Sequence, residues 1–312
     1  MRLLLCALLI VSVAFVIALP FVLPVYPETL ATETLILGLF AMSIDILAGV
    51  TGRVPLGHGA IFGAGGYVVA YHVAVAGGNA WIGMLLGIVT SAAVAALFGA
   101  LAVRTTGVYF LLLTLAEGMI VWGICFRWTS VTGAENGIRG VARPALIADP
   151  HIFYYFVLLT VALAGFLIWR LVHSPFGQAL RGISESSSRM RTLGYNVPFT
   201  LTIAFTLSGV FAGLAGILLV FLNNFVSPSN VSLEQSTQGL LMVILGGAGT
   251  LWGALVGSAV IILLSNLVSA YTERWSMILG LMFIVTMLFA SEGLIGKAKA
   301  LARSYSAGRK TT

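Results

Sequence analysis

The segment HSPFGQALRGISESSSRMRTLGYNVP, residues 173–198, is polar, rich in serine and arginine, and lies between two strongly apolar runs. The runs at 153–172 and 199–222 can each cross a bilayer, because a transmembrane helix needs roughly 20 apolar residues. The contrast between this segment, called the inner loop below, and its flanks predicts an all-α membrane protein whose spans are joined by polar loops.

The composition supports the same class. The 312 residues are 59% hydrophobic and 8% charged, whereas about a quarter of the residues of a soluble domain are charged. The net charge of +6 does not indicate nucleic-acid binding, because the basic residues lie beside apolar runs instead of forming one patch. Cys6 and Cys125 lie in apolar runs, where we expect them to be small core side chains and not a disulfide or metal pair.

Ten apolar runs are candidate crossings. The first run, 3–23, is too long for a signal peptide, and no small-x-small cleavage site follows it, so we expect a retained helix. One run, 237–248, is short and ends in the glycine-rich sequence LGGAGTLWG (245–253). The long runs are 3–23, 31–50, 57–76, 81–102, 108–126, 153–172, 199–222, 252–271 and 275–291.

The placement of lysine and arginine predicts the orientation. With the N-terminus in the cytoplasm, 12 of the 16 basic residues fall on the cytoplasmic side and four fall outside. The basic tail 297–312 places the C-terminus in the cytoplasm as well. Two cytoplasmic termini require an even number of crossings, so 237–248 must cross too. We therefore expect one transmembrane domain, 1–296, with about ten crossings, a glycine-broken short helix and an outer loop at 127–151.

The inner loop has the periodicity of a short amphipathic helix. Phe176, Leu180 and Ile183 are spaced i, i+4, i+7 and form one apolar face. Pro175 suits a first helical turn, and Gly194 suits a helix end. The residues alone leave three interpretations open: a solvated connector, a helix resting on lipid headgroups, and a docking element for a partner.

Two carboxylates stand out inside the predicted spans. Asp45 lies past the middle of 31–50, and Glu117 lies near the centre of 108–126. A charged side chain in a span costs about 2.5–3.5 kcal/mol on insertion scales, which makes each a functional candidate. Either carboxylate could line a translocation path or be satisfied by hydrogen bonds between helices.

Further candidates lie at glycines. His58 stands between two glycines. It could bind a cation or carry a proton, or be a hydrogen-bonded packing residue.

Gly246, Gly247 and Gly249 end the short crossing, and glycine-broken helices often line a cavity in transporters. A tight turn is the alternative. The four histidines have no metal-ligand spacing.

Seven stretches together resemble one family. They resemble ABC-transporter permeases of the branched-chain amino acid type, in the LivM-like branch, and they occur in the family's order along 40–294. The stretches are VPLGHGAIFGAGGYVVA (54–70), TTGVYFLLLTLAEGM (105–119), WTSVTGAENGIRGV (128–141), PFGQALRGISESSSRMRTLGYN (175–196), AFTLSGVFAGLAGILL (204–219), LLMVILGGAGTLWGALVGSAV (240–260) and YTERWSMILGLMFIVTMLFASEGL (271–294).

The resemblance implies a permease subunit of an ABC importer in the bacterial inner membrane. Such a subunit is not an enzyme and holds no cofactor of its own; ATP and magnesium bind to two partner ATPases. A second, related permease and a periplasmic substrate-binding protein complete the assembly. The sequence agrees in lacking the phosphate loop G-x-x-x-x-G-K-[ST]. The implied solute is a branched-chain amino acid, although related systems import urea and amides.

The resemblance also assigns roles to loop residues. It places the ATPase contacts in the inner loop, at Phe176, Gly177, Arg181, Glu185 and Gly194. The serine run SESSS (184–188) departs from the family pattern and weakens the predicted helix.

The outer loop has two interpretations. We expect it to contact the binding protein; a plain connector is the alternative. The candidate contacts are Thr132, Gly133, Asn136 and Arg139.

A second class of function remains open for the whole chain. It is an ion- or proton-coupled secondary transporter in which Asp45 and Glu117 carry the coupling.

Overall fold

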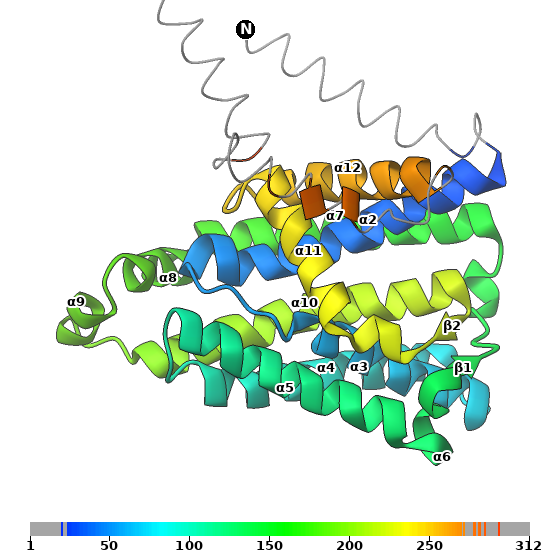
Figure 1. Cartoon of the computed structure of the whole chain (residues 1–312), viewed down its shortest axis with the longest axis horizontal. Coiled ribbons are helices and arrows are strands. Elements are labelled where there is room, and N and C mark those ends of the chain that lie inside the picture. Colours follow the sequence, from blue (N-terminus) through cyan, green and yellow to red (C-terminus); the bar gives the residue numbers. More distant parts are fainter. Residues whose placement is uncertain are drawn as a thin grey trace, which may run out of the picture.

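The computed structural model describes residues 24–269, together with Pro20, Tyr271, Met277, Ile278, Gly280, Leu281, Ile284 and Gly293. These residues form helices and one small two-stranded sheet (Figure 1). The predicted all-α class is therefore confirmed. The predicted crossings 3–23 and 275–291 and the tail 297–312 lie outside the described residues, apart from isolated positions.

Six helices among the described residues are long and apolar enough to cross a membrane. They confirm six of the predicted spans, with ends that shift by a few residues. These helices are α2 (Val25–Asp45) continued by η1 (Ile46–Thr51), α4 (Ala80–Ala102), α5 (Val108–Arg127), α7 (Pro150–His173), α10 (Val197–Asn223) and α12 (Trp252–Ser269).

The expected count of about ten crossings is not supported. The predicted spans 57–76 and 237–248 are shorter helices, namely α3 (His58–Ala70) continued by η2 (Tyr71–Val75), and α11 (Leu233–Gly246). Neither is among the six candidate spans. The physical reason is local: α3 starts only after the non-helical stretch 52–57, and α11 starts with the polar sequence LEQSTQ. The expected cytoplasmic location of both termini is not supported by the described residues either.

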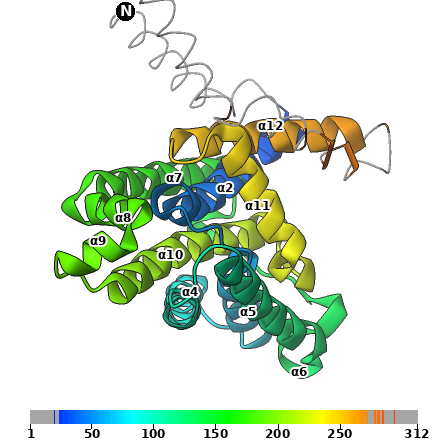
Figure 2. The same cartoon turned by 60° about the vertical axis from the view of Figure 1, so that its left-hand side comes forward.

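The bundle has two central helices. In the most apolar stretch of each long helix, 78% of the residues of α2 and 72% of those of α10 are buried, compared with 28–39% in α4, α5, α7 and α12. Helix α10 packs against α2, α3 and α4, while α2 packs against α7 and α12. Helix α10 thus separates α2 and α7 from α4 and α5 (Figures 1 and 2). The peripheral helices expose large apolar side chains such as Leu85, Ile120 and Leu159, as expected where lipid is the solvent.

Small residues allow the central helices to approach closely. A Cβ atom on Gly213 of α10 would collide with Ser91 of α4, and one on Gly216 would collide with the carbonyl oxygen of Phe62 in α3. Membrane helices associate through such small-residue contacts, because lipid provides no hydrophobic force between helices.

The connecting segments gather at two opposite ends of the bundle (Figure 1). One end carries α8 (Pro175–Glu185) and α9 (Ser187–Thr192), which belong to the inner loop. The other end carries the outer loop and the turn after α10, joined by the antiparallel pairs Ile138–Val226 and Arg139–Phe225. The elements at that end are α6 (Thr129–Thr132), η3 (Ala134–Asn136), β1 (Ile138–Arg139), η4 (Ala145–Ile147), β2 (Phe225–Val226) and η5 (Pro228–Val231).

Candidate functional site

The inner loop forms two short helices. The predicted amphipathic helix is confirmed as α8, whose Leu180 and Ile183 are buried and whose Phe176 is partly buried against the core. Ser174 caps its N-terminus by accepting a bond from the backbone N–H of Gly177 (3.4 Å), and Pro175 occupies the first turn. The cap and the apolar face together hold α8 against the bundle.

The serine run marks a corner. Ser186 has extended backbone, so it ends α8, and its hydroxyl caps α9 by accepting a bond from Arg189 N–H (3.3 Å). Serine favours caps over helix interiors, which explains why the helix divides here. Gly194, after α9, has φ +88°, a conformation that favours glycine.

The outward face of α8 and α9 is exposed and charged. Four charged side chains, Arg181, Glu185, Arg189 and Arg191, are exposed there. The sequence analysis missed two neighbouring apolar side chains, Leu193 (72% exposed) and Tyr195 (46% exposed). The signal was available, because these side chains flank Gly194 in a polar loop. We call these six residues the α8–α9 face.

Gly177, by contrast, is buried against the end of α7. A Cβ atom there would collide with the carbonyl oxygen of Val172 at the end of α7. Gly177 therefore permits the sharp turn from α7 into α8.

Helix α8 rests on η1, the continuation of α2. A Cβ on Gly52, directly after η1, would meet the side chain of Ser184. Arg53 donates from Nη1 to the carbonyl oxygens of Val103 (3.2 Å) and Thr105 (2.7 Å) and so caps the end of α4. Burial, and then the charge of Arg191, lower the pKa of Arg53. The α8–α9 face is thus attached to the ends of α2 and α4.

Asp45 holds the turn between α11 and α12. Its carboxylate is buried and accepts backbone N–H bonds from Gly249 (2.6 Å) and Leu251 (3.0 Å). Gly249 lies against Gly49 of η1, where a Cβ would collide with it. Asp45 is therefore satisfied by hydrogen bonds to another part of the bundle, which is one of the two roles predicted for it. The bonds link α2 to residues 204 and 206 positions further along the chain.

The glycines of this turn serve backbone geometry. Gly247 and Gly249 have φ of +106° and +79°, and a Cβ on Gly246 would collide with the carbonyl oxygen of Gly253. The region Gly246–Gly249 is therefore a tight turn that brings α11 and α12 together.

Helix α3 begins inside the protein, and side chains from two other helices satisfy its start. Thr114 of α5 accepts a bond from Leu56 N–H (3.1 Å), and Ser236 of α11 accepts one from Gly59 N–H (2.8 Å). Freed backbone groups at membrane depth are tolerated only with such partners. Thr114 lies in an apolar helix but Ser236 lies in the polar sequence LEQSTQ, so the two residues share no sequence signal.

His58 is fully buried and links three helices. Its Nε2 lies 2.7 Å from Ser208 Oγ of α10, and Ser208 Oγ donates to the carbonyl oxygen of Ser43 in α2 (2.5 Å). Because the single hydroxyl proton is used toward Ser43, His58 Nε2 must carry the proton and donate to Ser208. Within the described part of the chain His58 Nδ1 has no hydrogen-bond partner.

Glu117 is a buried carboxylate without a bonding partner among the described residues. Its side chain is 5% exposed, and within the described residues neither oxygen has a hydrogen-bond partner. The adjacent Gly118 packs on Gly57 at the start of α3. Gly118 also lines a narrow cleft with Leu56, Val231 and Ser236. Glu117 is thus near the break before α3, in contrast to Asp45, which is fully engaged.

The predicted outer-loop residues divide into two pairs. Thr132 is buried and shares its single hydroxyl proton between the carbonyl oxygens of Cys125 (2.6 Å) and Trp128 (2.7 Å), and Gly133 has φ +71°. These two shape the loop. Asn136 and Arg139 are exposed, and the Arg139 guanidinium lies 5.7 Å from the centre of the Phe225 ring. Only this second pair is available to a partner.

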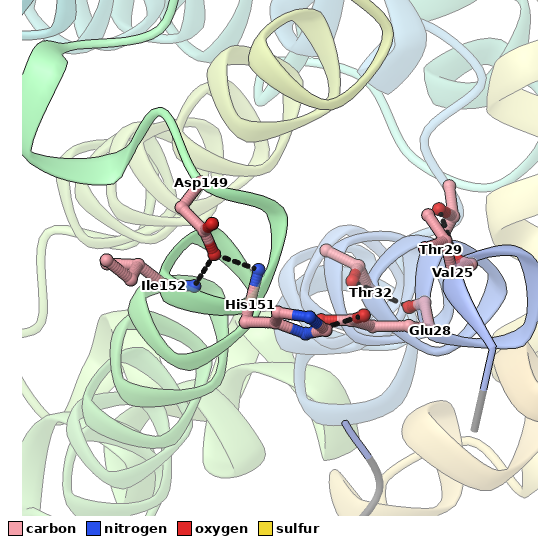
Figure 3. Close-up of polar contacts among 7 residues, drawn as sticks. All are labelled: Val25, Glu28, Thr29, Thr32, Asp149, His151 and Ile152. Atoms are coloured by element: carbon pink, nitrogen blue, oxygen red, sulfur yellow. Dashed lines mark hydrogen bonds and ion pairs between the residues drawn. The ribbon is translucent and has the colours of Figure 1, made fainter. Parts of the chain in front are cut away.

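A histidine and a buried carboxylate join α2 and α7 at the outer-loop end (Figure 3). His151 Nδ1 lies 3.0 Å from the carboxylate of Glu28, which is 2% exposed. Asp149 fixes the start of α7 by accepting bonds from the N–H groups of His151 (2.9 Å) and Ile152 (3.3 Å). The cap therefore positions the histidine beside the buried carboxylate.

Replacing His151 by glutamine is expected to destabilise the bundle slightly. The change removes the imidazole that contacts the buried Glu28 carboxylate. We expect the free energy of unfolding to fall by about 1 kcal/mol, because His151 is half exposed and solvent screens the pair. Thermal unfolding of the purified protein measures this effect. The matched control is His173→Gln on the same helix, whose ring contacts Trp169 of its own helix through the carbonyl oxygen and the indole ring. Equal losses in both variants would contradict the assignment.

The fold and these contacts define a multi-pass helical membrane protein with an interrupted helix and a charged helical face at one end. A family model described as "Branched-chain amino acid transport system / permease component" matches residues 26–287. The chain belongs to this family of transport permeases.

Several curated relatives match the chain. The high-affinity branched-chain amino acid transport system permease protein LivM of Salmonella typhimurium is 29% identical over 94% of this chain and 75% of its own length. The LivH permease of the corresponding system in Escherichia coli is 22% identical over 83% of this chain and 91% of its own. The autoinducer 2 import system permease LsrC of Klebsiella pneumoniae is 28% identical over 53% of this chain and 49% of its own. No solved structure matches the chain.

Proposed function

We propose that this chain is the transmembrane permease subunit of an ABC importer that moves branched-chain amino acids inward. The observation that carries the proposal is the charged, exposed α8–α9 face, carried by a helix, α8, that packs directly on η1. A face that was merely solvated would not need the buried anchors Leu180 and Ile183. In this proposal two partner ATPases, which bind ATP and magnesium, dock on the face.

The proposed orientation places the α8–α9 face in the cytoplasm of a bacterial cell, with the chain in the inner membrane. Support comes from the basic residues of that end, including Arg53, Arg181 and Arg191, because positive charge favours the cytoplasmic side. The proposed topology has about ten crossings, with α3 and α11 as short ones, 3–23 and 275–291 as the outermost ones, and both termini inside. Residues 1–296 then form one permease domain.

The proposed route of movement starts at α8. Helix α8 packs on η1, Asp45 beside η1 binds the turn 247–251, and that turn joins α11 to α12. Ser236 of α11 in turn binds the start of α3. A shift of α8 driven by an ATPase can therefore reach the break at 52–57 through direct contacts. Coupling through such a chain needs elements with two arrangements, and the glycine-rich turn and the interrupted helix supply candidates.

The proposed partners are a second related permease, two ATPases and a periplasmic binding protein. The LivM and LivH relatives carry the name of one transport system, which supports a paired permease. Asn136 and Arg139, the exposed residues of the outer loop, are the proposed contacts of the binding protein, and Thr132 and Gly133 hold the loop in shape.

The alternative of an ion- or proton-coupled transporter is not favoured. It requires Asp45 and Glu117 to exchange a cation, but both Asp45 oxygens already accept backbone bonds. Membership of the permease family points the same way.

The substrate class follows from the relatives' names. LivM and LivH are named for branched-chain amino acids, and LsrC for autoinducer 2. The test is uptake of labelled leucine by the reconstituted assembly, with unlabelled isoleucine, valine, urea and short amides as competitors. We expect isoleucine and valine to compete. Competition by urea or amides alone would contradict the proposed substrate.

Replacing Glu117 by alanine is expected to lower uptake about ten-fold, because an unpaired carboxylate beside the broken helix is placed to meet the substrate ammonium. Glu117→Gln, which keeps the volume, separates charge from packing and should lose a similar amount. Docking of the ATPases should be unchanged in both variants. Normal uptake by Glu117→Gln would show that Glu117 acts only in packing.

A further inference from the structure

A cavity lies at the outer-loop end, apart from the proposed translocation route. It has a volume of about 340 Å³ and is formed by the end of η2, the first turn of α4 and the segment 142–146. Binding pockets for small molecules begin at about 300 Å³. Its walls include Val73, Trp81, Pro144 and Leu146, and its lining contains a single charged side chain, Arg143.

Arg143 is held firmly but keeps unused donors. Its Nε donates to the carbonyl oxygen of Phe221 (2.7 Å) and its Nη2 to that of Leu222 (3.0 Å), so it caps the end of α10. Its guanidinium carbon lies 4.3 Å from the centre of the Phe153 ring. Arginine has five N–H donors, and these two bonds leave Nη1 unused within the described residues. The one ion pair among those residues is His151–Glu28, so Arg143 has no acidic partner there.

The first turn of α4 adds to the positive potential. Asn79 caps this 23-residue helix by accepting a bond from Trp81 N–H (2.9 Å), and Asn79, Ala80 and Trp81 all line the cavity. A helix N-terminus carries a partial positive charge and favours anions, phosphate in particular. Burial lowers the pKa of Arg143, so an anion in the cavity would stabilise the guanidinium. The cavity thus pairs two sources of positive potential with no carboxylate in its lining.

The rim of the cavity is apolar and continues along α4. Trp81 is 40% exposed and Leu146 is 75% exposed. Further along α4 from Trp81, the side chains of Ile82, Leu85 and Val89 are exposed on the surface that we expect to face lipid. Tryptophan gathers at membrane–water interfaces, which places the cavity at headgroup depth. A ligand with a phosphate and acyl chains fits this combination, whereas a soluble anion leaves the apolar rim uncovered.

We propose that this cavity binds the headgroup phosphate of an anionic phospholipid through Arg143 and the start of α4, with an acyl chain along Ile82, Leu85 and Val89. The bound lipid would fasten α4 to the segment 142–146, and through Arg143 to the end of α10. The site is independent of the proposed transport function.

The test compares lipids and variants of the purified full chain in detergent. We expect dioleoyl phosphatidylglycerol to raise the melting temperature by ~3 °C more than dioleoyl phosphatidylcholine does, and native mass spectrometry to retain one phosphatidylglycerol. Arg143→Gln should abolish both effects. The matched control, Arg139→Gln, should keep them, because Arg139 also lies at this end and near an aromatic ring but does not line the cavity.

A second pair of variants covers the case in which Arg143→Gln fails to fold. Leu146→Glu places a negative charge at the exposed rim without disturbing the core and should weaken retention of phosphatidylglycerol, whereas Leu146→Gln should not. Three results would overturn the proposal. Equal stabilisation by inorganic phosphate would indicate a soluble anion, and equal losses in Arg139→Gln would show that the effect is not specific to the cavity. Retained lipid binding in Leu146→Glu, together with weakened binding of the periplasmic protein, would assign the cavity to that partner.

Discussion

Glu185→Arg is expected to lower ATP-driven uptake about ten-fold, which corresponds to ~1.4 kcal/mol in the docking equilibrium. Glu185 is exposed on the α8–α9 face and has no ion-pair partner within the described residues, so its reversal changes the surface without unfolding α8. The measurement is uptake per ATP hydrolysed in proteoliposomes. We expect hydrolysis by the partner ATPases to continue while transport falls.

Two further variants sharpen this prediction. Leu180→Pro breaks α8 in its interior and removes a buried anchor, so its loss of uptake should exceed that of Glu185→Arg. Glu135→Arg makes the same charge change on an exposed residue of the outer loop and should leave ATPase association unchanged. If Glu185→Arg transports with normal coupling, the α8–α9 face does not carry the movement.

Asp45→Ala is expected to destabilise the protein by about 3 kcal/mol, because it leaves one buried and one part-buried backbone N–H group without their acceptor. Those groups belong to Gly249 and Leu251. Asp45→Asn, which keeps the volume, should lose a smaller amount and also lower ATP-driven uptake, since the turn 247–251 is less firmly attached to η1. Thermal unfolding and uptake measure the two effects.

Ser43→Ala is the matched control for Asp45. Ser43 lies two residues earlier on α2, and among the described residues its hydroxyl donates to the carbonyl oxygen of Phe40 in the same helix (2.6 Å). We expect this variant to unfold and transport almost as the unmodified protein does. An Asp45→Ala variant as stable as Ser43→Ala would contradict the structural role of Asp45.

The sequence predicts the long spans well, because a run of about 20 apolar residues has few alternatives to a helix in lipid. The period of Phe176, Leu180 and Ile183 predicts α8 for a similar reason, since one apolar face on a short segment specifies a surface helix. Both inferences depend on neighbours within a few residues. The break at Ser186 also has a local cause, the preference of serine for helix caps.

The interruptions and the partners of polar groups are long-range features. The stretch 52–57 is stable without helical bonds because Thr114 and Ser236 satisfy the start of α3, and no local pattern announces these partners. Asp45 could be recognised as costly from its place in a span, but its acceptor role depends on a turn more than 200 residues away. Glu117 carried the same sequence signal and has no bonding partner within the described residues.

The source of energy tests the central claim most directly. Proteoliposomes containing this chain, its partner permease and the two ATPases are supplied with binding protein loaded with labelled leucine. The account predicts uptake only when ATP is present on the side of the α8–α9 face, and no change when proton and sodium gradients are collapsed. Uptake by this chain alone, driven by an ion gradient and indifferent to ATP, would contradict it.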